Sequence, residues 1–168
     1  MSESAGKRGR KTGIGTLIFF YSGFLAAFVL DRISKAIILF MIPENSSFEV
    51  FRFLHITNIK NPGICFGFLD SPVYLPVLIF ASIIALGLII VYMHKKKTAL
   101  PVFPVFCFGL ISGGILGNLV DRIIHRGVID FIDFRVWPVF NLADTFIVCG
   151  IAFLVLFYSR RKDASGMF

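Results

Sequence analysis

The chain has 168 residues, of which 57% are hydrophobic and only 16% are charged, and its mean hydropathy is +0.84. Soluble domains are typically about 45–50% apolar, so this composition excludes an ordinary soluble protein and predicts an integral membrane protein. The net charge of +7 comes from basic residues in short patches, which favours an anionic membrane surface over nucleic acid as the partner.

Four apolar stretches have the length expected of membrane-spanning helices. A helix needs about 20 residues to cross the hydrocarbon core of a bilayer. The predicted spans cover residues 14–42, 73–93, 99–120 and 143–158. They form one four-helix membrane domain, residues 14–158, between an N-terminal tail, 1–13, and a C-terminal tail, 159–168. The predicted fold class is therefore a membrane all-α protein.

The segment between the first two spans has a different composition. Phe48 to Ile56 is rich in aromatic and β-branched residues, which favours short strands. The turn signal Asn61-Pro62-Gly63 follows. We therefore expect a small β-structure between the first and second helices.

The distribution of basic residues predicts the orientation of the chain. Lys and Arg gather in the short loops and tails on the cytoplasmic side of membrane proteins. Ten of the seventeen lie in the N-terminal tail, in Lys95 to Lys97 and in Arg160 to Lys162. We therefore expect both termini in the cytoplasm and the β-structure on the extracytoplasmic side.

Polar residues from distant parts of the sequence gather at one end of the predicted bundle. Asp31 lies near the outer end of the first helix, and Asp144 lies at the outer start of the fourth. Asn118, Asp121 and Arg122 share one side of the third helix by their i, i+3, i+4 spacing. Ionisable groups at the rim of a bilayer are costly, so they indicate a functional site.

Paired aspartates in this region predict acid–base chemistry. One ionised carboxylate can take a proton from water while a second, protonated one donates to a carbonyl oxygen. Asp144 is favoured as one member because the start of a helix stabilises a carboxylate. Asp130 is favoured as the other, but it lies in an extended segment in which Asp133 points to the opposite face. The residues alone leave open which of these two faces the site.

Other interpretations of the same residues stay open at this point. Each aspartate could instead form an ion pair with an arginine or cap a helix. A small channel or transporter lined by Asp31, Asp121 and Asp144 is an alternative, because acids inside membranes also line ion paths. So is a subunit whose charges dock a partner protein. The histidines show no zinc-binding spacing and the three cysteines no CxxC pair, so we expect free thiols and neither a metal nor a cofactor.

Five blocks of sequence occur in the order and spacing of one known family. They are Asp31 to Lys35, Asn61 to Gly67, Gly113 to Arg122, Gly127 to Phe134 and Trp137 to Asp144. These blocks closely resemble the motifs of lipoprotein signal peptidase, also called signal peptidase II. The resemblance covers about residues 31–144, and the chain length and four-span topology are similar too.

The resemblance implies an intramembrane aspartyl endopeptidase of the bacterial cytoplasmic membrane. It would cut prolipoproteins on the amino side of a diacylglyceryl-modified cysteine and release the signal peptide. The family pattern assigns the catalytic pair to Asp130 and Asp144, which selects Asp130 over Asp133. It implies supporting or substrate-binding roles for Asp31, Lys35, Asn61, Gly63, Asn118, Asp121, Arg122 and Asn141. It also implies a β-cradle within residues 46–68, membrane lipid around the helices, and a globomycin-type cyclic peptide as an inhibitor.

Overall fold

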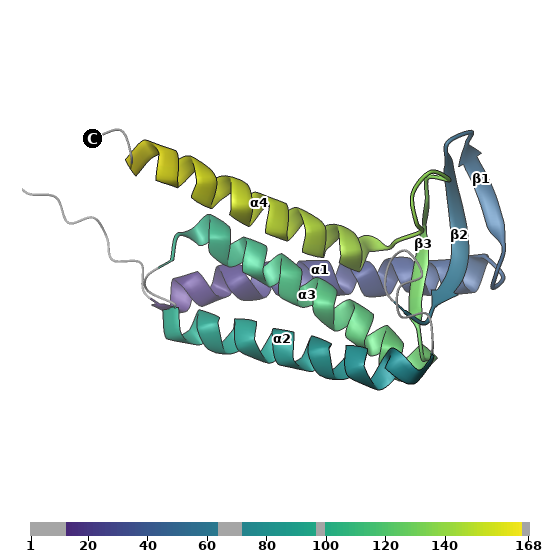
Figure 1. Cartoon of the computed structure of the whole chain (residues 1–168), viewed down its shortest axis with the longest axis horizontal. Coiled ribbons are helices and arrows are strands. Elements are labelled where there is room, and N and C mark those ends of the chain that lie inside the picture. The colour runs from purple at the N-terminus through teal and green to yellow at the C-terminus, as the bar shows by residue number, and fades with distance from the viewer. Residues whose placement is uncertain (1–12, 64–71, 97–99, 166–168) are drawn as a thin grey trace, which may run out of the picture.

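Four long helices dominate the structure, a computed structural model that describes residues 13–63, 72–96 and 100–165 (Figure 1). The helices are α1 (Gly13–Met41), α2 (Leu75–Lys96), α3 (Val102–His125) and α4 (Leu142–Ser165). Each is long and apolar enough to cross a membrane. The predicted four-helix membrane fold is therefore confirmed.

Three helices continue beyond the ends of the apolar stretches that predict them. α2 continues past residue 93 to Lys96, α3 past residue 120 to His125, and α4 past residue 158 to Ser165. Hydropathy marks where a chain leaves the bilayer, whereas a helix continues until its backbone hydrogen bonds are interrupted. α3 stops at Arg126, whose φ of 58° lies in the left-handed region that ends many helices.

Two of the sequence predictions fall partly outside the described residues. Of the predicted N-terminal tail, residues 1–12 lie outside them. Of the three cysteines, Cys107 and Cys149 are free thiols, and Cys65 lies outside the described residues.

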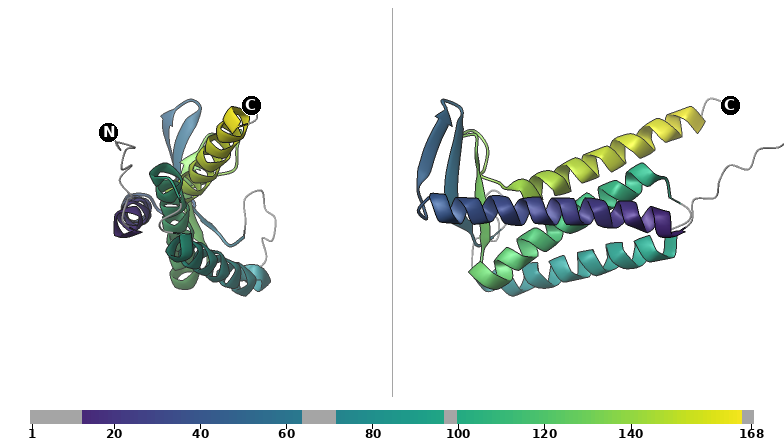
Figure 2. Two further views of the ribbon diagram at one scale, coloured as in Figure 1. Left: turned by 90° about the vertical axis from the view of Figure 1, so that its left-hand side faces the viewer. Right: turned by 180° about the vertical axis from the view of Figure 1, so that it is seen from behind.

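A three-stranded antiparallel sheet covers one end of the bundle, here called the sheet end (Figures 1 and 2). Its strands, in spatial order, are β1 (Ser47–Phe51), β2 (Leu54–Asn61) and β3 (Val128–Asp133). β1 and β2 form the β-structure expected between the first two helices, and the short helix η2 (Pro72–Tyr74) leads into α2. β3 comes from the connection between α3 and α4. Its pairing with β2 goes beyond the prediction, because an extended segment does not specify its partner strand.

Small residues bring the central helix α3 close to its neighbours. A β-carbon on Gly109 or Gly113 would strike the backbone carbonyl of Phe20 or Phe24 in α1. A β-carbon on Gly114 would lie 2.5 Å from the carbonyl oxygen of Ala143 in α4. Membrane helices associate through such close contacts because lipid tails are as apolar as the side chains between them. Most of the span of α3 is buried, whereas α1, α2 and α4 expose apolar side chains outward.

Gly109→Ala is expected to destabilise the bundle. The added methyl group would meet the backbone of Phe20 and Phe24, so α1 and α3 must move apart at a cost of about 1–3 kcal/mol. Gly87→Ala in α2 is the matched control, because nothing lies within 4 Å of a β-carbon there. Thermal unfolding in one detergent compares the two variants. Equal melting temperatures would contradict the packing argument.

Candidate active site

Asp130 and Asp144, the predicted catalytic pair, line one small cavity at the sheet end of the bundle. Asp130 lies within β3, and Asp144 lies in the first turn of α4. The cavity has a volume of about 60 Å³, enough for one or two water molecules. Its other lining residues are Asn61, Gly63, Asn118, Arg122 and Val128. All of these except Val128 are residues that the sequence assigns to the site.

Three asparagines hold the two carboxylates. Asp130 accepts hydrogen bonds from the side-chain amides of Asn61 (Nδ2 to Oδ2, 2.9 Å) and Asn141 (Nδ2 to Oδ1, 2.6 Å). Asp144 accepts one from Asn118 (Nδ2 to Oδ1, 2.7 Å). Asn141 also donates to Asn118 Oδ1 at 3.2 Å, so the amides connect both carboxylates in a single network. Buried polar groups that are satisfied in this way fix one arrangement of side chains.

The local sequence at the start of α4 sets the position of Asp144. Asn141 precedes the helix, and its Oδ1 accepts a hydrogen bond from the backbone N–H of Asp144 at 2.9 Å. In return, Asp144 Oδ2 accepts one from the backbone N–H of Asn141 at 3.4 Å. This reciprocal pair is a capping box with Asp in the place of Glu. The helix-capping interpretation is therefore correct for Asp144, and the same carboxylate lines the cavity.

Asp130 is placed to hold a proton near neutral pH. The residue is only 2% exposed. Burial, and after it the nearby charge of Asp144, raises the pKa of the Asp130 carboxyl to about 7, although hydrogen bonds from Asn61 and Asn141 act in the opposite direction. A neutral carboxyl group beside a second carboxylate is the arrangement that acid–base catalysis by paired aspartates requires.

Asp133 lies on the other face of β3 and does not line the cavity. Its Oδ2 accepts a hydrogen bond from the hydroxyl of Thr57 at 3.2 Å. Its Oδ1 accepts one from the backbone N–H of Arg135 at 2.7 Å, and the Arg135 guanidinium lies 3.4 Å from Oδ2. The alternation of the strand therefore places Asp130, and not Asp133, beside Asp144.

A buried network of charges joins α1 to α3 next to the pair. The ammonium group of Lys35 lies 2.9 Å from Asp31 Oδ2 and 2.8 Å from Asp121 Oδ2. It also donates a hydrogen bond to Asn118 Oδ1 at 3.0 Å. Arg32 pairs with the other oxygen of Asp121. Lys35 and both of its aspartates are fully buried, and with Arg32 the network holds two positive charges against two negative ones.

The two aspartates of this network also bind the backbone beside the pair. Asp31 Oδ1 accepts a hydrogen bond from the N–H of Ala143, the residue before Asp144, at 3.0 Å. Asp121 Oδ2 accepts one from the N–H of Ile129, the residue before Asp130, at 3.2 Å. Asp31, Lys35 and Asp121 thus lie outside the cavity wall. The two aspartates contact the pair through the backbone, and Lys35 does so through the side chain of Asn118.

The sequence prediction missed one residue of the cavity wall, Val128, and one residue on the opposite face of β3, Thr57. Val128 lines the cavity and stands two residues before Asp130. The period of two in an extended segment puts both on one face, so this signal could have identified Val128. Thr57, which orients Asp133, reaches it through the pairing of β2 with β3. No local pattern in the sequence indicates that contact.

The fold and the site together define a class of protein, a multi-pass membrane peptidase of the aspartic type. The sequence model of the family described as Signal peptidase (SPase) II matches residues 24–160. The chain belongs to the signal peptidase II family, and the resemblance found in its sequence motifs is confirmed.

Known proteins match nearly the whole chain. The lipoprotein signal peptidase of Syntrophomonas wolfei subsp. wolfei is 40% identical over 148 residues, which cover 86% of this chain and 97% of that protein. The lipoprotein signal peptidase of Halothermothrix orenii is 36% identical over 139 residues, covering 82% and 93%. A solved bacterial membrane enzyme superposes with a TM-score of 0.75 at 27% identity, covering 94% of this chain and 93% of that chain.

Lys35→Met is expected to destabilise the protein by about 3–5 kcal/mol, because it removes the cation between two buried carboxylates. Lys60→Met is the matched control. Lys60 lies 3.6 Å from Glu44 at the surface, and its loss should change the free energy of unfolding by less than about 1 kcal/mol. Denaturation in detergent measures both. If Lys35→Met and the wild type have the same free energy of unfolding, Lys35 does not neutralise the buried carboxylates.

Proposed function

We propose that this chain removes signal peptides from bacterial prolipoproteins, cutting on the amino side of a diacylglyceryl-modified cysteine, with Asp130 and Asp144 as the catalytic pair. Membership of the signal peptidase II family supports the reaction. The names of its relatives support lipoprotein precursors as the substrate. The observation that carries the residue assignment is that the buried Asp130 and the half-buried Asp144 line one cavity with room for a water molecule.

In the proposed mechanism the two aspartates divide the acid and base roles. The ionised Asp144 takes a proton from water while the water oxygen bonds to the scissile carbonyl carbon. The protonated Asp130 donates its proton to the carbonyl oxygen, which gives a tetrahedral diol. The diol then collapses as the carbon–nitrogen bond breaks. Asp144 gives its proton to the leaving nitrogen, and Asp130 recovers a proton from one hydroxyl group.

The environments of the two carboxyl groups support this division. Asp144 lies at the N-terminus of α4, where backbone amides and the helix dipole stabilise a negative charge. Asp130 lies in a strand, and its raised pKa keeps the proton available near neutral pH. The proton would therefore reside on Asp130 in the resting enzyme, and the coupled pair would titrate as a unit.

The rest of the cavity wall provides groups for holding a peptide. Asn61 and Arg122 carry side-chain donors at the cavity, which suit the carbonyl oxygens of an extended substrate. Gly63 donates its backbone N–H to Asn61 Oδ1 at 3.0 Å, and this contact fixes the chain after β2. These residues would align the scissile bond with the pair.

The proposed location is the bacterial cytoplasmic membrane, with the site at the extracytoplasmic face and both termini in the cytoplasm. Basic residues of α2 and α4 lie at the end opposite the sheet, which supports this orientation (Figure 1). Membrane lipid would surround the exposed apolar faces, and a globomycin-type cyclic peptide would compete with the substrate for the site.

A reporter fusion tests the proposed orientation. A reporter that works only in the cytoplasm should be active when it is fused after Phe168. An inactive but stable fusion would reverse the orientation.

A channel or transporter has less support from the structure. The buried Asp31, Asp121 and Asp130 and the half-buried Asp144 lie at the sheet end, where each has hydrogen-bonding partners. α2 carries no acidic residue between Leu75 and Lys96 that could continue a path across the membrane. A docking subunit would show no turnover at all, which the next experiment tests directly.

Asp130→Asn and Asp144→Asn should each reduce cleavage of a diacylglyceryl-modified prolipoprotein by roughly 10²–10⁴-fold or more, because each removes half of the proton relay. Asp133→Asn is the matched control and should retain most of the activity. At a pH above about 7, the melting temperature of Asp130→Asn should equal or exceed that of the wild type, because the neutral amide places no charge in the buried position. Cleavage by purified protein in detergent gives the first readout and thermal unfolding the second. Selective inactivation by Asp133→Asn would contradict the assignment.

The rate of cleavage should fall as the pH rises above about 7. Burial and the charge of Asp144 raise the pKa of Asp130 to about 7, so the acid keeps its proton below that pH and loses it above. The measurement is kcat/KM against pH, with Asp133→Asn expected to give the same alkaline limb as the wild type. A rate that still rises at about pH 8 would exclude Asp130 as the general acid.

A further inference from the structure

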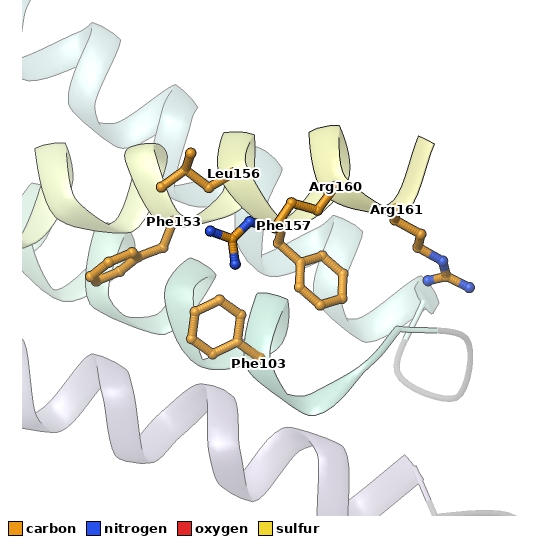
Figure 3. Close-up of a pocket in the computed structure, with 6 residues that line it drawn as sticks. All are labelled: Phe103, Phe153, Leu156, Phe157, Arg160 and Arg161. Carbon is orange, nitrogen blue, oxygen red and sulfur yellow. The ribbon is translucent and has the colours of Figure 1, made fainter. Parts of the chain in front are cut away.

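A second cavity lies between α3 and α4 at the end of the bundle opposite the sheet (Figures 1 and 3). Its volume is about 620 Å³. It is lined by Phe103, Phe153, Leu156, Phe157, Arg160 and Arg161. It shares no residue with the cavity of the aspartate pair, and the proposed reaction does not use it. We call it the aromatic cup.

The cup exists because the residues between α3 and α4 change in size along the helices. Nearer the sheet, Gly114 and Gly150 allow close contact, and a β-carbon on Gly150 would lie 2.6 Å from Ile111. Farther along, the ring of Phe103 packs against Phe153 and Phe157, with ring centroids 6.1 and 5.9 Å apart. These bulky rings hold the helices apart, and α4 diverges from α3 toward its C-terminal end (Figures 1 and 2).

Two arginines give the cup a positive mouth. The side chain of Arg160 extends over the aromatic rings, while Arg161 points the other way, toward the end of α4 (Figure 3). Both residues are exposed, and neither forms an ion pair among the described side chains. A guanidinium group matches the geometry of a phosphate and can bind it through two parallel hydrogen bonds.

The start of α3 adds to the positive potential at this end. Phe103 belongs to the first turn of α3, and the residue at its N-cap is Pro101, which forms no side-chain cap. The backbone N–H groups of a first turn carry a partial positive charge that favours an anion. The mouth of the cup therefore combines two guanidinium groups with the N-terminal end of a helix.

We propose that the aromatic cup binds one anionic phospholipid, with its phosphate held by Arg160 and attracted also by the charge of Arg161, and with an acyl chain packed against the phenylalanines. By its length and composition, the candidate span of α4 runs to Lys162, which would put the arginines at the level of lipid headgroups and the rings at the level of the acyl chains. A soluble phosphate would leave the rings uncovered, and a neutral lipid would leave the arginines unpaired. Basic pockets between membrane helices bind anionic headgroups by the same chemistry.

Native mass spectrometry of the purified, delipidated chain tests the proposal with phosphatidylglycerol and phosphatidylcholine as probes. One phosphatidylglycerol should bind more tightly than any phosphatidylcholine. Arg160→Gln with Arg161→Gln should weaken it about fivefold for each charge removed. Phe153→Ala, which removes one wall of the cup, should weaken it as well. Arg160 and Arg161 are exposed, so the double variant is expected to keep the elution volume and helical content of the wild type.

Lys95→Gln with Lys96→Gln is the matched control, because it removes two exposed charges at the same end of the bundle but outside the cup. This variant should bind phosphatidylglycerol like the wild type. An equal loss in both double variants would mean that overall charge, and not the cup, attracts the lipid. Unchanged binding by the arginine variant, or complete displacement of the lipid by inorganic phosphate, would overturn the proposal.

Discussion

The ammonium group of Lys35 is the interaction on which the rest of the structure depends. It is buried between the carboxylates of Asp31 and Asp121, and those two carboxylates each accept a hydrogen bond from the peptide next to a member of the aspartate pair. One cation therefore determines how α1, α3, the start of α4 and β3 meet. The interaction is costly to assemble, because the three charged groups leave water. Once formed, it permits few other arrangements of the surrounding helices and strand. This arrangement favours a fixed geometry over maximal stability.

The aspartate pair is positioned by elements that also serve the fold. Asn141 and Asp144 cap α4 with their side chains, and the same two side chains serve the site. The amide nitrogen of Asn141 binds Asp130, and Asp144 lines the cavity. Asn61 ends β2 and holds the other oxygen of Asp130. Each group thus satisfies a backbone or side-chain requirement that would exist without any substrate. In the proposed reaction these contacts would hold the pair in place before a substrate binds, which lowers the cost of positioning in catalysis.

The sequence predicts the helices and the polar face of α3 because each of these leaves a local pattern, whereas the choice of Asp130 and the inclusion of Asn61 and Gly63 depend on the resemblance to the family motifs. Apolar runs mark the spans, and the alternation of β3 separates Asp130 from Asp133 once one face is known. The contacts between distant segments leave no such pattern. Asp31 binds the backbone of Ala143, 112 positions away. β3, which follows α3, pairs with β2, which lies between α1 and α2. Hydropathy also misplaces the end of α3, since charged residues beyond the apolar run remain helical.

The pairing of β3 with β2 has a consequence for biogenesis. β1 and β2 can form a hairpin soon after the first helix has entered the membrane, but β3 emerges only after α3, and Asp144 only with α4. β2 therefore cannot pair with β3 until α1, α2 and α3 have been inserted. A nascent or truncated chain that stops before α4 holds at most one of the two aspartates, and a chain with a misinserted α3 places β3 on the wrong side of the bilayer. The two aspartates of the proposed catalytic pair therefore come together only in molecules in which all four helices have been inserted.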